Sequence, residues 1–187
     1  MPTLASKPNE IMKKQQYRVR NAKHYEFSEL GKLMVQVYSQ LEGFPTTTEQ
    51  PIYYKMLANI GELTSKPKTE LLVAVSSDNK IVGGVVYFGD MKYYGSEGIA
   101  TKEQNASGFR LLAVDTLFRG HGIGKLLTNE CIKKAIENKQ NQLIIHSTKS
   151  MQIAWKMYEN LGFKRSVDLD FLQGELPVFG FRLMLKK

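Results

Sequence analysis

The fold is decided by one stretch of the chain, Leu111-Leu-Ala-Val-Asp115-Thr-Leu-Phe-Arg119-Gly-His-Gly-Ile-Gly124-Lys-Leu-Leu127. An apolar run ends at Asp115, a short link follows, and three glycines then open a run with the apolar spacing of an amphipathic helix. Because glycine has no Cβ, the backbone N–H groups at the start of such a helix stay accessible to a phosphate. The stretch therefore predicts a strand, a phosphate-binding loop and a helix, in that order.

Two common phosphate-binding motifs do not fit this loop. A P-loop needs a glycine where Arg119 stands and a serine or threonine where Leu126 stands. The dinucleotide fingerprint needs a third glycine at the position of Lys125. The spacing that remains is Arg119-x-x-Gly122-x-Gly124, and a glycine-rich turn without a ligand is the alternative interpretation of the loop taken alone.

A second informative segment is Ser150-Met-Gln-Ile-Ala154-Trp-Lys-Met-Tyr158-Glu-Asn-Leu-Gly162-Phe163. It predicts a helix with Ser150 as N-cap, and with Gly162 in the left-handed position after its last turn. Five apolar residues at helical spacing form the expected buried stripe: Ile153, Ala154, Met157, Tyr158 and Leu161.

Together the two segments resemble the GNAT superfamily of acetyl-CoA-dependent N-acetyltransferases. The resemblance spans residues 17–187 and is specific over residues 109–164. It implies an α/β fold: a mixed, largely antiparallel central sheet, splayed between the fourth and fifth strands and flanked by helices. It also implies that acetyl-CoA binds in the V-shaped opening between those two strands, as a cosubstrate and without a metal.

Carried over residue by residue, the resemblance assigns the two parts of the cosubstrate to two sets of residues. The pantetheine arm is expected along Leu112, Ala113 and Val114. The pyrophosphate is expected on the main-chain N–H groups of Arg119, Gly120, His121, Gly122, Ile123, Gly124 and Lys125.

The resemblance also suggests catalytic residues. Tyr158 matches the tyrosine that protonates the departing thiolate, although a core aromatic is the alternative from the sequence alone. His146 stands twelve residues earlier, where some members carry a glutamate, and an imidazole is a suitable base near neutral pH. A hydrogen-bonded structural histidine and a base made of waters are the alternatives. Met151 replaces an asparagine that touches the cofactor in some relatives.

The expected activity is transfer of acetyl from acetyl-CoA to the primary amine of a small molecule, by direct attack in a ternary complex. A protein or peptide acetyltransferase, acting on an N-terminus or a lysine, and a non-catalytic CoA-binding regulatory module are the alternatives. Glu42 and Glu97 are candidates for attracting a cationic amine, or are simply solvated loop residues. The pairs Tyr53-Tyr54 and Tyr93-Tyr94 are candidates for lining the acceptor pocket.

The composition of the chain indicates its domain organisation and argues against several other classes of protein. The chain of 187 residues is expected to form one domain, residues 17–187, after a flexible tail, residues 1–16. Its net charge of +8 is spread along the chain, which argues against a nucleic-acid partner. The sequence has no apolar run of membrane-spanning length, no secretory signal and no metal-ligand spacing. The single cysteine, Cys131, is expected to be buried and reduced in the cytoplasm, and a homodimer is left open.

The coarse pattern along the chain alternates strands and helices. Strands are expected at residues 17–20, 70–76, 81–88, 109–114, 142–148, 165–171 and 180–185, and helices at residues 27–41, 49–63, 123–136 and 150–161. Residues 89–107 are expected to form a long loop.

Overall fold

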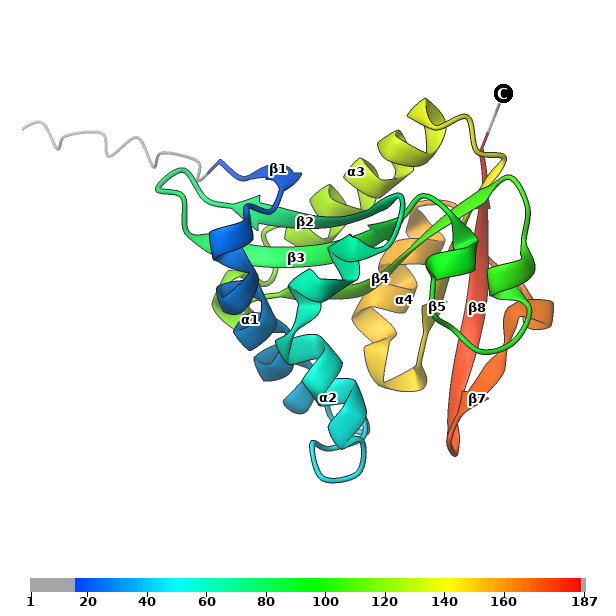
Figure 1. Ribbon diagram of the computed structural model, residues 1–187, viewed down its shortest axis with the longest axis horizontal. Coiled ribbons are helices and arrows are strands. Elements are labelled where there is room, and N and C mark those ends of the chain that lie inside the picture. Colours follow the sequence, from blue (N-terminus) through cyan, green and yellow to red (C-terminus); the bar gives the residue numbers. More distant parts are fainter. Residues whose placement is uncertain (1–15, 186–187) are drawn as a thin grey trace, which may run out of the picture.

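The computed structural model describes residues 16–185, and the predicted tail lies, except for residue 16, outside the described residues. It is a mixed α/β fold in which one open sheet runs through the molecule (Figure 1). The strands are β1 (Arg18–Asn21), β2 (Thr69–Val75), β3 (Ile81–Phe88), β4 (Ala106–Val114), β5 (Gln142–Ser147), β6 (Lys164–Arg165), β7 (Phe171–Gln173) and β8 (Leu176–Met184). The α-helices are α1 (Phe27–Ser39), α2 (Pro51–Ala58), α3 (Ile123–Glu137) and α4 (Gln152–Asn160).

The sheet has the order β1-β2-β3-β4-β5-β8-β6, and β7 pairs with β8. All neighbours are antiparallel except β4 and β5, which are parallel. A parallel pair needs a crossover connection, and α3 provides it between β4 and β5. The expected fold class, a largely antiparallel mixed sheet flanked by helices, is therefore confirmed.

Successive side chains of each strand point to opposite faces of the sheet, and the core is therefore divided into two layers. In β2, Leu71 and Val73 point to the layer formed with α1 and α2, whereas Leu72 and Ala74 point to the layer formed with α3. We call these the α1–α2 face and the α3–α4 face of the sheet, because Tyr158 of α4 belongs to the second layer. β2 and β3 are almost wholly buried, since helices cover both of their faces.

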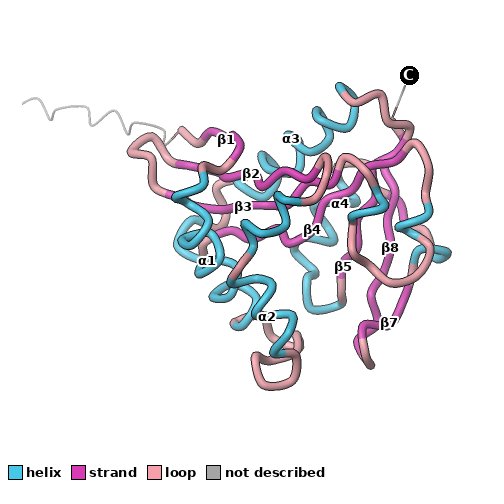
Figure 2. Tube along the Cα trace, viewed as in Figure 1, coloured by secondary structure: helices cyan, strands magenta, loops and turns pink. Residues whose placement is uncertain are grey.

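The β4–β5 pair opens into a fork. Pairing covers only three positions, from Ala106 with Gln142 to Gly108 with Ile144. Beyond Gly108, β4 stays paired with β3 and β5 stays paired with β8, so the strands diverge and their facing edges lack a strand partner (Figures 1 and 2). Gly108 is needed here, because a Cβ would lie 2.7 Å from the ring of Tyr94 and 2.8 Å from the Ile144 carbonyl oxygen.

A β-bulge lies just past the fork. On β3, only Val85 separates Gly84 and Val86, whereas two residues of β4 separate their partners Ala113 and Arg110. The extra residue is accommodated by Leu111, whose φ of 61° is in the left-handed region. The bulge therefore turns the β4 backbone at the place where the edge of β4 that faces β5 has no strand partner.

Several element boundaries differ from the sequence expectation. The predicted strand 165–171 is wrong as one element, because a 3-10 turn at Val167–Leu169 separates β6 from β7. The final strand starts at Leu176, earlier than expected, since residues 176–178 pair with β7 before residues 179–184 pair with β5. The second helix ends at Ala58 and continues as a 3-10 helix. Short 3-10 turns also interrupt the expected loop 89–107 (Figure 2).

The late helix differs from its predicted form at its start and agrees at its end. Ser150 is not its N-cap, because a 3-10 turn, Lys149–Met151, precedes α4. Ile153 is 86% exposed and lies outside the buried stripe. At the other end, Gly162 has φ +95°, and the amides of Gly162 and Phe163 donate to the carbonyls of Glu159 and Tyr158. This is the predicted left-handed helix stop.

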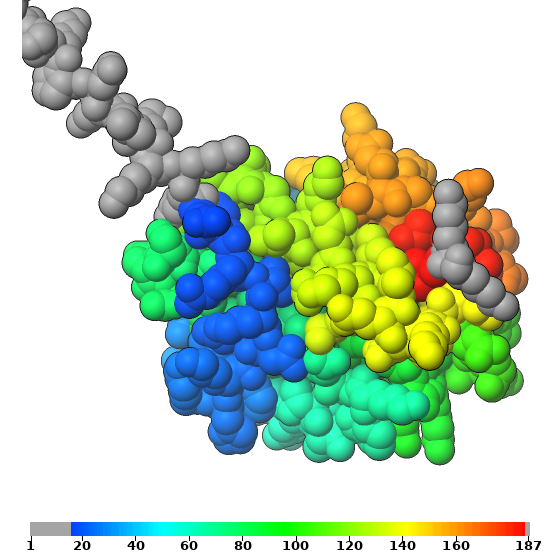
Figure 3. Space-filling model, turned by 90° about the horizontal axis from the view of Figure 1, so that it is seen from above, coloured from blue at the N-terminus to red at the C-terminus, as the bar shows by residue number. Residues whose placement is uncertain are grey.

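The crossover helix α3 lies across the face of the molecule seen from above, between the N-terminal residues and the C-terminal strands (Figure 3). Its inner side carries Cys131, which is fully buried and unpaired, as the sequence predicts for a small apolar residue. Over residues 16–185, no helix is both long enough and apolar enough to span a membrane.

Candidate active site

The glycine loop forms the start of α3. Gly122 is the N-cap, with φ +78°, and no side chain caps the first turn. A Cβ at Gly120 or Gly122 would meet nothing within 4 Å, so the backbone here is open to a ligand. The first N–H groups of a helix have no partner inside it. The loop therefore presents free donors and the positive end of the helix dipole, as a pyrophosphate site needs.

The side chains of the loop support this arrangement. Arg119 and Lys125 are exposed and add positive charge on either side of the glycines. His121 is also exposed, but its Nδ1 lies 3.0 Å from the carbonyl oxygens of both Phe118 and Arg119. Because carbonyl oxygens only accept, Nδ1 carries a hydrogen and donates within the loop. The His121 ring therefore fixes the loop conformation and leaves its own amide for a ligand.

Gly124 connects the loop to the fork. A Cβ at this position would lie 3.5 Å from Sδ of Met157, on α4, and 3.9 Å from Cγ2 of Val114, at the end of β4. Leu112 and Val114 are half-buried and pack against the α3–α4 layer, whereas Ala113 is buried in the other layer. The predicted pantetheine residues thus lie on the free stretch of β4 that leads from the fork to the glycine loop.

Tyr158 lies at the apex of the fork. Its ring packs edge-on against Phe109, at 5.8 Å between centroids, and Phe109 directly follows the last β4 residue paired with β5. The ring of Phe163 lies 5.7 Å away, and Tyr158 is only 5% exposed. Burial raises the pKa of the Tyr158 hydroxyl well above its ordinary value. The group is therefore protonated at neutral pH and can act as a proton donor.

His146 lies on β5 at the opposite side of the fork, on the α1–α2 face. Its Nε2 is 2.9 Å from the carbonyl oxygen of Leu169, so Nε2 carries the hydrogen. Its Nδ1 is 3.0 Å from the Tyr94 hydroxyl and accepts a hydrogen bond from it. Burial, aided by the positive charge of Arg110, lowers the pKa of His146 to about 4. The imidazole is therefore neutral at pH 7, and both of its nitrogens are hydrogen-bonded.

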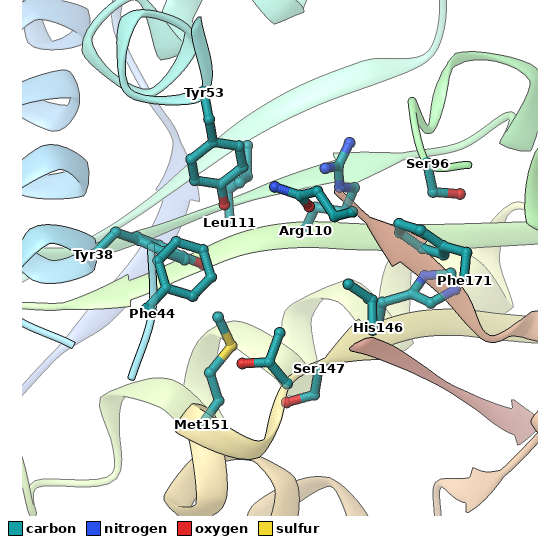
Figure 4. A pocket seen from close by; sticks show the side chains of 13 residues that line it. Tyr38, Phe44, Tyr53, Ser96, Arg110, Leu111, His146, Ser147, Met151 and Phe171 are labelled. Atoms are coloured by element: carbon teal, nitrogen blue, oxygen red, sulfur yellow. The ribbon is translucent and has the colours of Figure 1, made fainter. Parts of the chain in front are cut away.

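A pocket opens beside His146 on the α1–α2 face (Figure 4). Its walls come from α1, the segment before α2, α2 itself, β4, β5 and the β7–β8 hairpin. The lining residues are Tyr38, Phe44, Tyr53, Ser96, Arg110, Leu111, His146, Ser147, Thr148, Met151, Phe171, Gln173 and Val178. The bulge residue Leu111 belongs to this wall, so the pocket reaches the free edge of β4.

Only some of the residues predicted to bind the acceptor line this pocket. Tyr53 lines the pocket, whereas Tyr54 is buried behind it and donates to the Pro45 carbonyl oxygen at 2.8 Å. Tyr94 is fully buried and reaches the pocket through His146. Glu42 and Glu97 are exposed and do not line the pocket.

Met151, noted in the sequence for replacing an asparagine, is a pocket wall residue. Trp155 packs between α4 and the sheet, with its ring 4.8 Å from that of Phe181.

Sequence reasoning missed Arg110 and the hydroxyl groups beside it. Arg110 is half-buried, and its Nη1 donates to the carbonyl oxygens of Tyr94 and Gly95 at 2.9 and 3.0 Å. A single arginine inside an apolar strand was a signal that could have identified it. Ser147 and Thr148 are 2% and 4% exposed, and their hydroxyls have no partner among residues 16–185. No sequence pattern marks these two residues.

The fork joins two different surfaces. The glycine loop, the free β4 edge and Tyr158 belong to the α3–α4 face, and the pocket with Arg110 and His146 belongs to the α1–α2 face. An elongated thioester on the first surface and a second molecule in the pocket would meet at the bulge. Within residues 16–185, no group of three or more His, Cys, Asp or Glu side chains is placed to hold a metal ion.

Comparison with known structures supports this architecture. A GNAT-family acetyltransferase from Staphylococcus aureus covers 91% of this chain and 100% of its own, with a TM-score of 0.67 and 18% identity. A putative acetyltransferase from Salmonella typhimurium, solved with its cofactor acetyl-CoA, covers 92% of this chain and 95% of its own, with a TM-score of 0.62 and 13% identity. At these identities the likeness concerns the fold.

Sequence comparison adds a relative and a family. The N-acetylaspartate synthetase of Danio rerio is 36% identical over 64 residues, which are 34% of this chain and 23% of that protein. The match thus spans about a quarter of the relative's length. The model of the acetyltransferase (GNAT) family matches residues 34–163, which include the glycine loop and the late helix. Since this match covers well over half of the chain, the protein belongs to the GNAT acetyltransferase family.

Proposed function

We propose that this protein transfers the acetyl group of acetyl-CoA to the primary amine of a small molecule. The observation that carries the proposal is the fork itself: β4 leaves β5 after Gly108, and its free edge runs from the pocket wall at Leu111 to the glycine loop. A thioester along this edge and an amine in the pocket would be held as two neighbouring reactants, which removes much of the entropic barrier to their reaction.

In the proposed reaction, the amine nitrogen attacks the thioester carbonyl carbon in a ternary complex. A C–N bond forms, the carbonyl oxygen becomes negative, and collapse of the intermediate breaks the C–S bond. Backbone N–H groups of β4 at the bulge would stabilise the oxyanion, because no strand pairs with this edge. Tyr158 is protonated at neutral pH and would give its proton to the sulfur. Because burial raises the pKa of Tyr158, this transfer depends on the negative charge that develops on sulfur as the C–S bond breaks.

The proton lost by the amine needs a base. His146 is the predicted base, and its Nδ1 is the ring nitrogen with a lone pair. That lone pair accepts from Tyr94, and the lowered pKa makes the imidazole a weak base. We therefore propose that water in the pocket carries this proton away and that His146 shapes the pocket wall. Direct proton acceptance by His146 is the competing proposal. The pH–rate profile of His146→Ala separates the two proposals, because the acidic limb of the profile would disappear in this variant only if His146 is the base.

The size of the acceptor follows from the pocket walls. Tyr53, Phe44 and Phe171 enclose the space on two sides, which favours a small molecule over a folded protein (Figure 4). The matched relative is named for a product of aspartate, so aspartate belongs among the first acceptors to be assayed. A protein or peptide N-terminus is the second candidate, because an extended end could enter such a pocket.

The test measures CoA thiol release from acetyl-CoA with a panel of amines, amino acids and peptides. The expected result is turnover with at least one small amine, abolished when acetyl-CoA is replaced by CoA. Tight acetyl-CoA binding without acetyl transfer to any acceptor would instead support a CoA-binding regulatory module. Turnover with peptides alone would support the protein acetyltransferase.

A further inference from the structure

Arg110 dominates the charge of the acceptor pocket. It is the one lining residue with a charged side chain at neutral pH, because His146 is neutral and no aspartate or glutamate lines the pocket in the described part of the chain. Its charge acts on several walls of the site: it lowers the pKa of His146 and opposes the burial-driven rise in the pKa of Tyr53. A cationic amine with a second positive charge would be repelled here.

The guanidinium keeps a free side. Its Nη1 has two hydrogens, and these serve the carbonyl oxygens of Tyr94 and Gly95. Over residues 16–185, Nε and Nη2 have no hydrogen-bond acceptor, and Arg110 forms no ion pair. Nε and Nη2 together form the edge of an arginine that binds a carboxylate with two parallel hydrogen bonds. The carbonyl oxygens of Tyr94 and Gly95 therefore hold Arg110 through Nη1 alone, and the edge formed by Nε and Nη2 remains available to a ligand.

The buried hydroxyls of the same pocket give a second, independent indication of a polar ligand. Ser147 and Thr148 are more than nine-tenths buried, and Ser96 also lines the pocket with a buried hydroxyl. None of the three has a hydrogen-bond partner within residues 16–185. Buried polar groups in folded proteins almost always find a partner, so a bound molecule with its own polar atoms is the natural one.

From these observations we propose that the acceptor is a small amine that carries a carboxylate, of the amino-acid class, and that Arg110 binds this carboxylate. The inference rests on the proposed acetyl transfer and specifies its substrate. Arg110 directly precedes Leu111, where the β4 edge turns toward the fork. A short acceptor fixed at Arg110 would place its amine near the free β4 edge (Figure 4).

The experiment compares matched acceptors. L-methionine and L-phenylalanine are each assayed beside the corresponding α-amide, and L-aspartate is assayed beside its diamide, which has no carboxylate. Spermidine is included as a polyamine, and kcat/KM is measured from CoA thiol release. We expect at least one acid to exceed its amide by about 100-fold, the range for a charge-assisted bond in a desolvated site. Spermidine should be a poor acceptor. The amide has the more acidic ammonium group, so its intrinsic reactivity cannot produce this preference.

Variants then assign the preference to Arg110. Arg110→Gln should lower kcat/KM for the acid about 100-fold more than kcat/KM for the amide, so that the acid-to-amide ratio falls toward one. Arg110→Lys should restore part of the ratio, because it keeps the charge and loses the planar fork. Arg18→Gln, on the exposed edge strand β1, is the matched control and should keep the wild-type ratio.

The outcomes separate this inference from the proposed function. A purely structural role of Arg110 would lower both rates together and keep the ratio, which would overturn the inference. Wild-type protein that acetylates amides or spermidine as well as acids would also overturn it, even if Arg110→Gln did not fold. Failure to acetylate any member of the panel would count against the proposed function. In that case, calorimetry with CoA and N-acetyl-L-methionine, compared with its amide, would still measure carboxylate binding at Arg110.

Discussion

The hydroxyl of Tyr94 lies 3.0 Å from Nδ1 of His146, and this bond joins two segments that meet at the fork. Tyr94 belongs to the long connection between β3 and β4, and His146 lies on β5, next to the carbonyl of Leu169. The same tyrosine holds Arg110 through its backbone carbonyl oxygen. Tyr94 therefore helps to fix the orientation of both His146 and Arg110 in the pocket wall.

The buried His146 predicts a pH dependence of stability. Its pKa is about 4 in the folded protein and near 6.5 when unfolded, so between these values the unfolded chain binds the proton and stability falls as the pH is lowered. The contribution is complete above pH 6.5 and amounts to roughly 3 kcal/mol between pH 6.5 and 4. Urea unfolding at pH 7 and pH 4 should therefore show a smaller acid loss for His146→Gln than for the wild type. The exposed His24→Gln should follow the wild type, and equal acid losses for all three proteins would contradict this account.

Tyr158→Phe tests the proposed proton donor. Loss of a general acid should lower kcat by about 100-fold while the affinity for acetyl-CoA stays within about twofold. The edge-on contacts with Phe109 and Phe163 are kept by phenylalanine, so the fold should survive. Tyr87→Phe is the control: it removes a hydroxyl bonded to Asn138 in the same core layer and should cost about 1 kcal/mol of stability without changing kcat. Unchanged turnover in Tyr158→Phe would remove Tyr158 from the mechanism.

Gly124→Val tests the cosubstrate loop. A Cβ at Gly124 makes only ordinary contact with Met157, so the helix should form, but the added methyl groups would occupy the space between the loop, β4 and α4. Acetyl-CoA affinity measured by calorimetry should fall at least 100-fold, and Gly124→Ala should show a smaller loss. Gly122→Val would be a poorer test, because φ +78° strains any L-residue. Wild-type affinity in Gly124→Val would show that the ligand lies elsewhere.

Asp170→Asn tests whether the hydrogen bonds of Asp170 hold the segment that contacts His146 in the pocket wall. Asp170 accepts two hydrogen bonds from Arg165, at 2.9 and 2.8 Å, and one from the Gly180 amide. Its loss should cost about 2 kcal/mol and raise the acceptor KM, because its neighbours Leu169 and Phe171 contact His146.

Asp168→Asn is the matched control for this change. Its carboxylate also pairs with an arginine, Arg182, but is 53% exposed, so less than about 1 kcal/mol should be lost. Equal effects of the two variants on stability and acceptor KM would contradict a supporting role for Asp170.

The local features of the site could be predicted because each depends on neighbours in the sequence. The glycine spacing determines the left-handed Gly122 and the uncapped start of α3, and Gly162 determines the end of α4. Apolar runs and helical spacing located most elements. The predictions were wrong where pairing between distant segments decides the outcome, as in residues 165–171, where a 3-10 turn separates β6 from β7 and the two strands pair with different parts of β8.

The sequence by itself determined the family resemblance, the order of elements and the chemistry available along the chain. Only the tertiary structure decided where β4 leaves β5, which layer each side chain enters, and which partners occupy its polar atoms. His146 and Arg110 illustrate the difference. A histidine on a strand can be a base until Tyr94 and Leu169 are seen on its two nitrogens. An arginine in an apolar strand has no assigned role until a pocket without carboxylates surrounds it. The reason is physical: burial and hydrogen bonding set the reactivity of these groups, and both are determined by residues distant in the sequence.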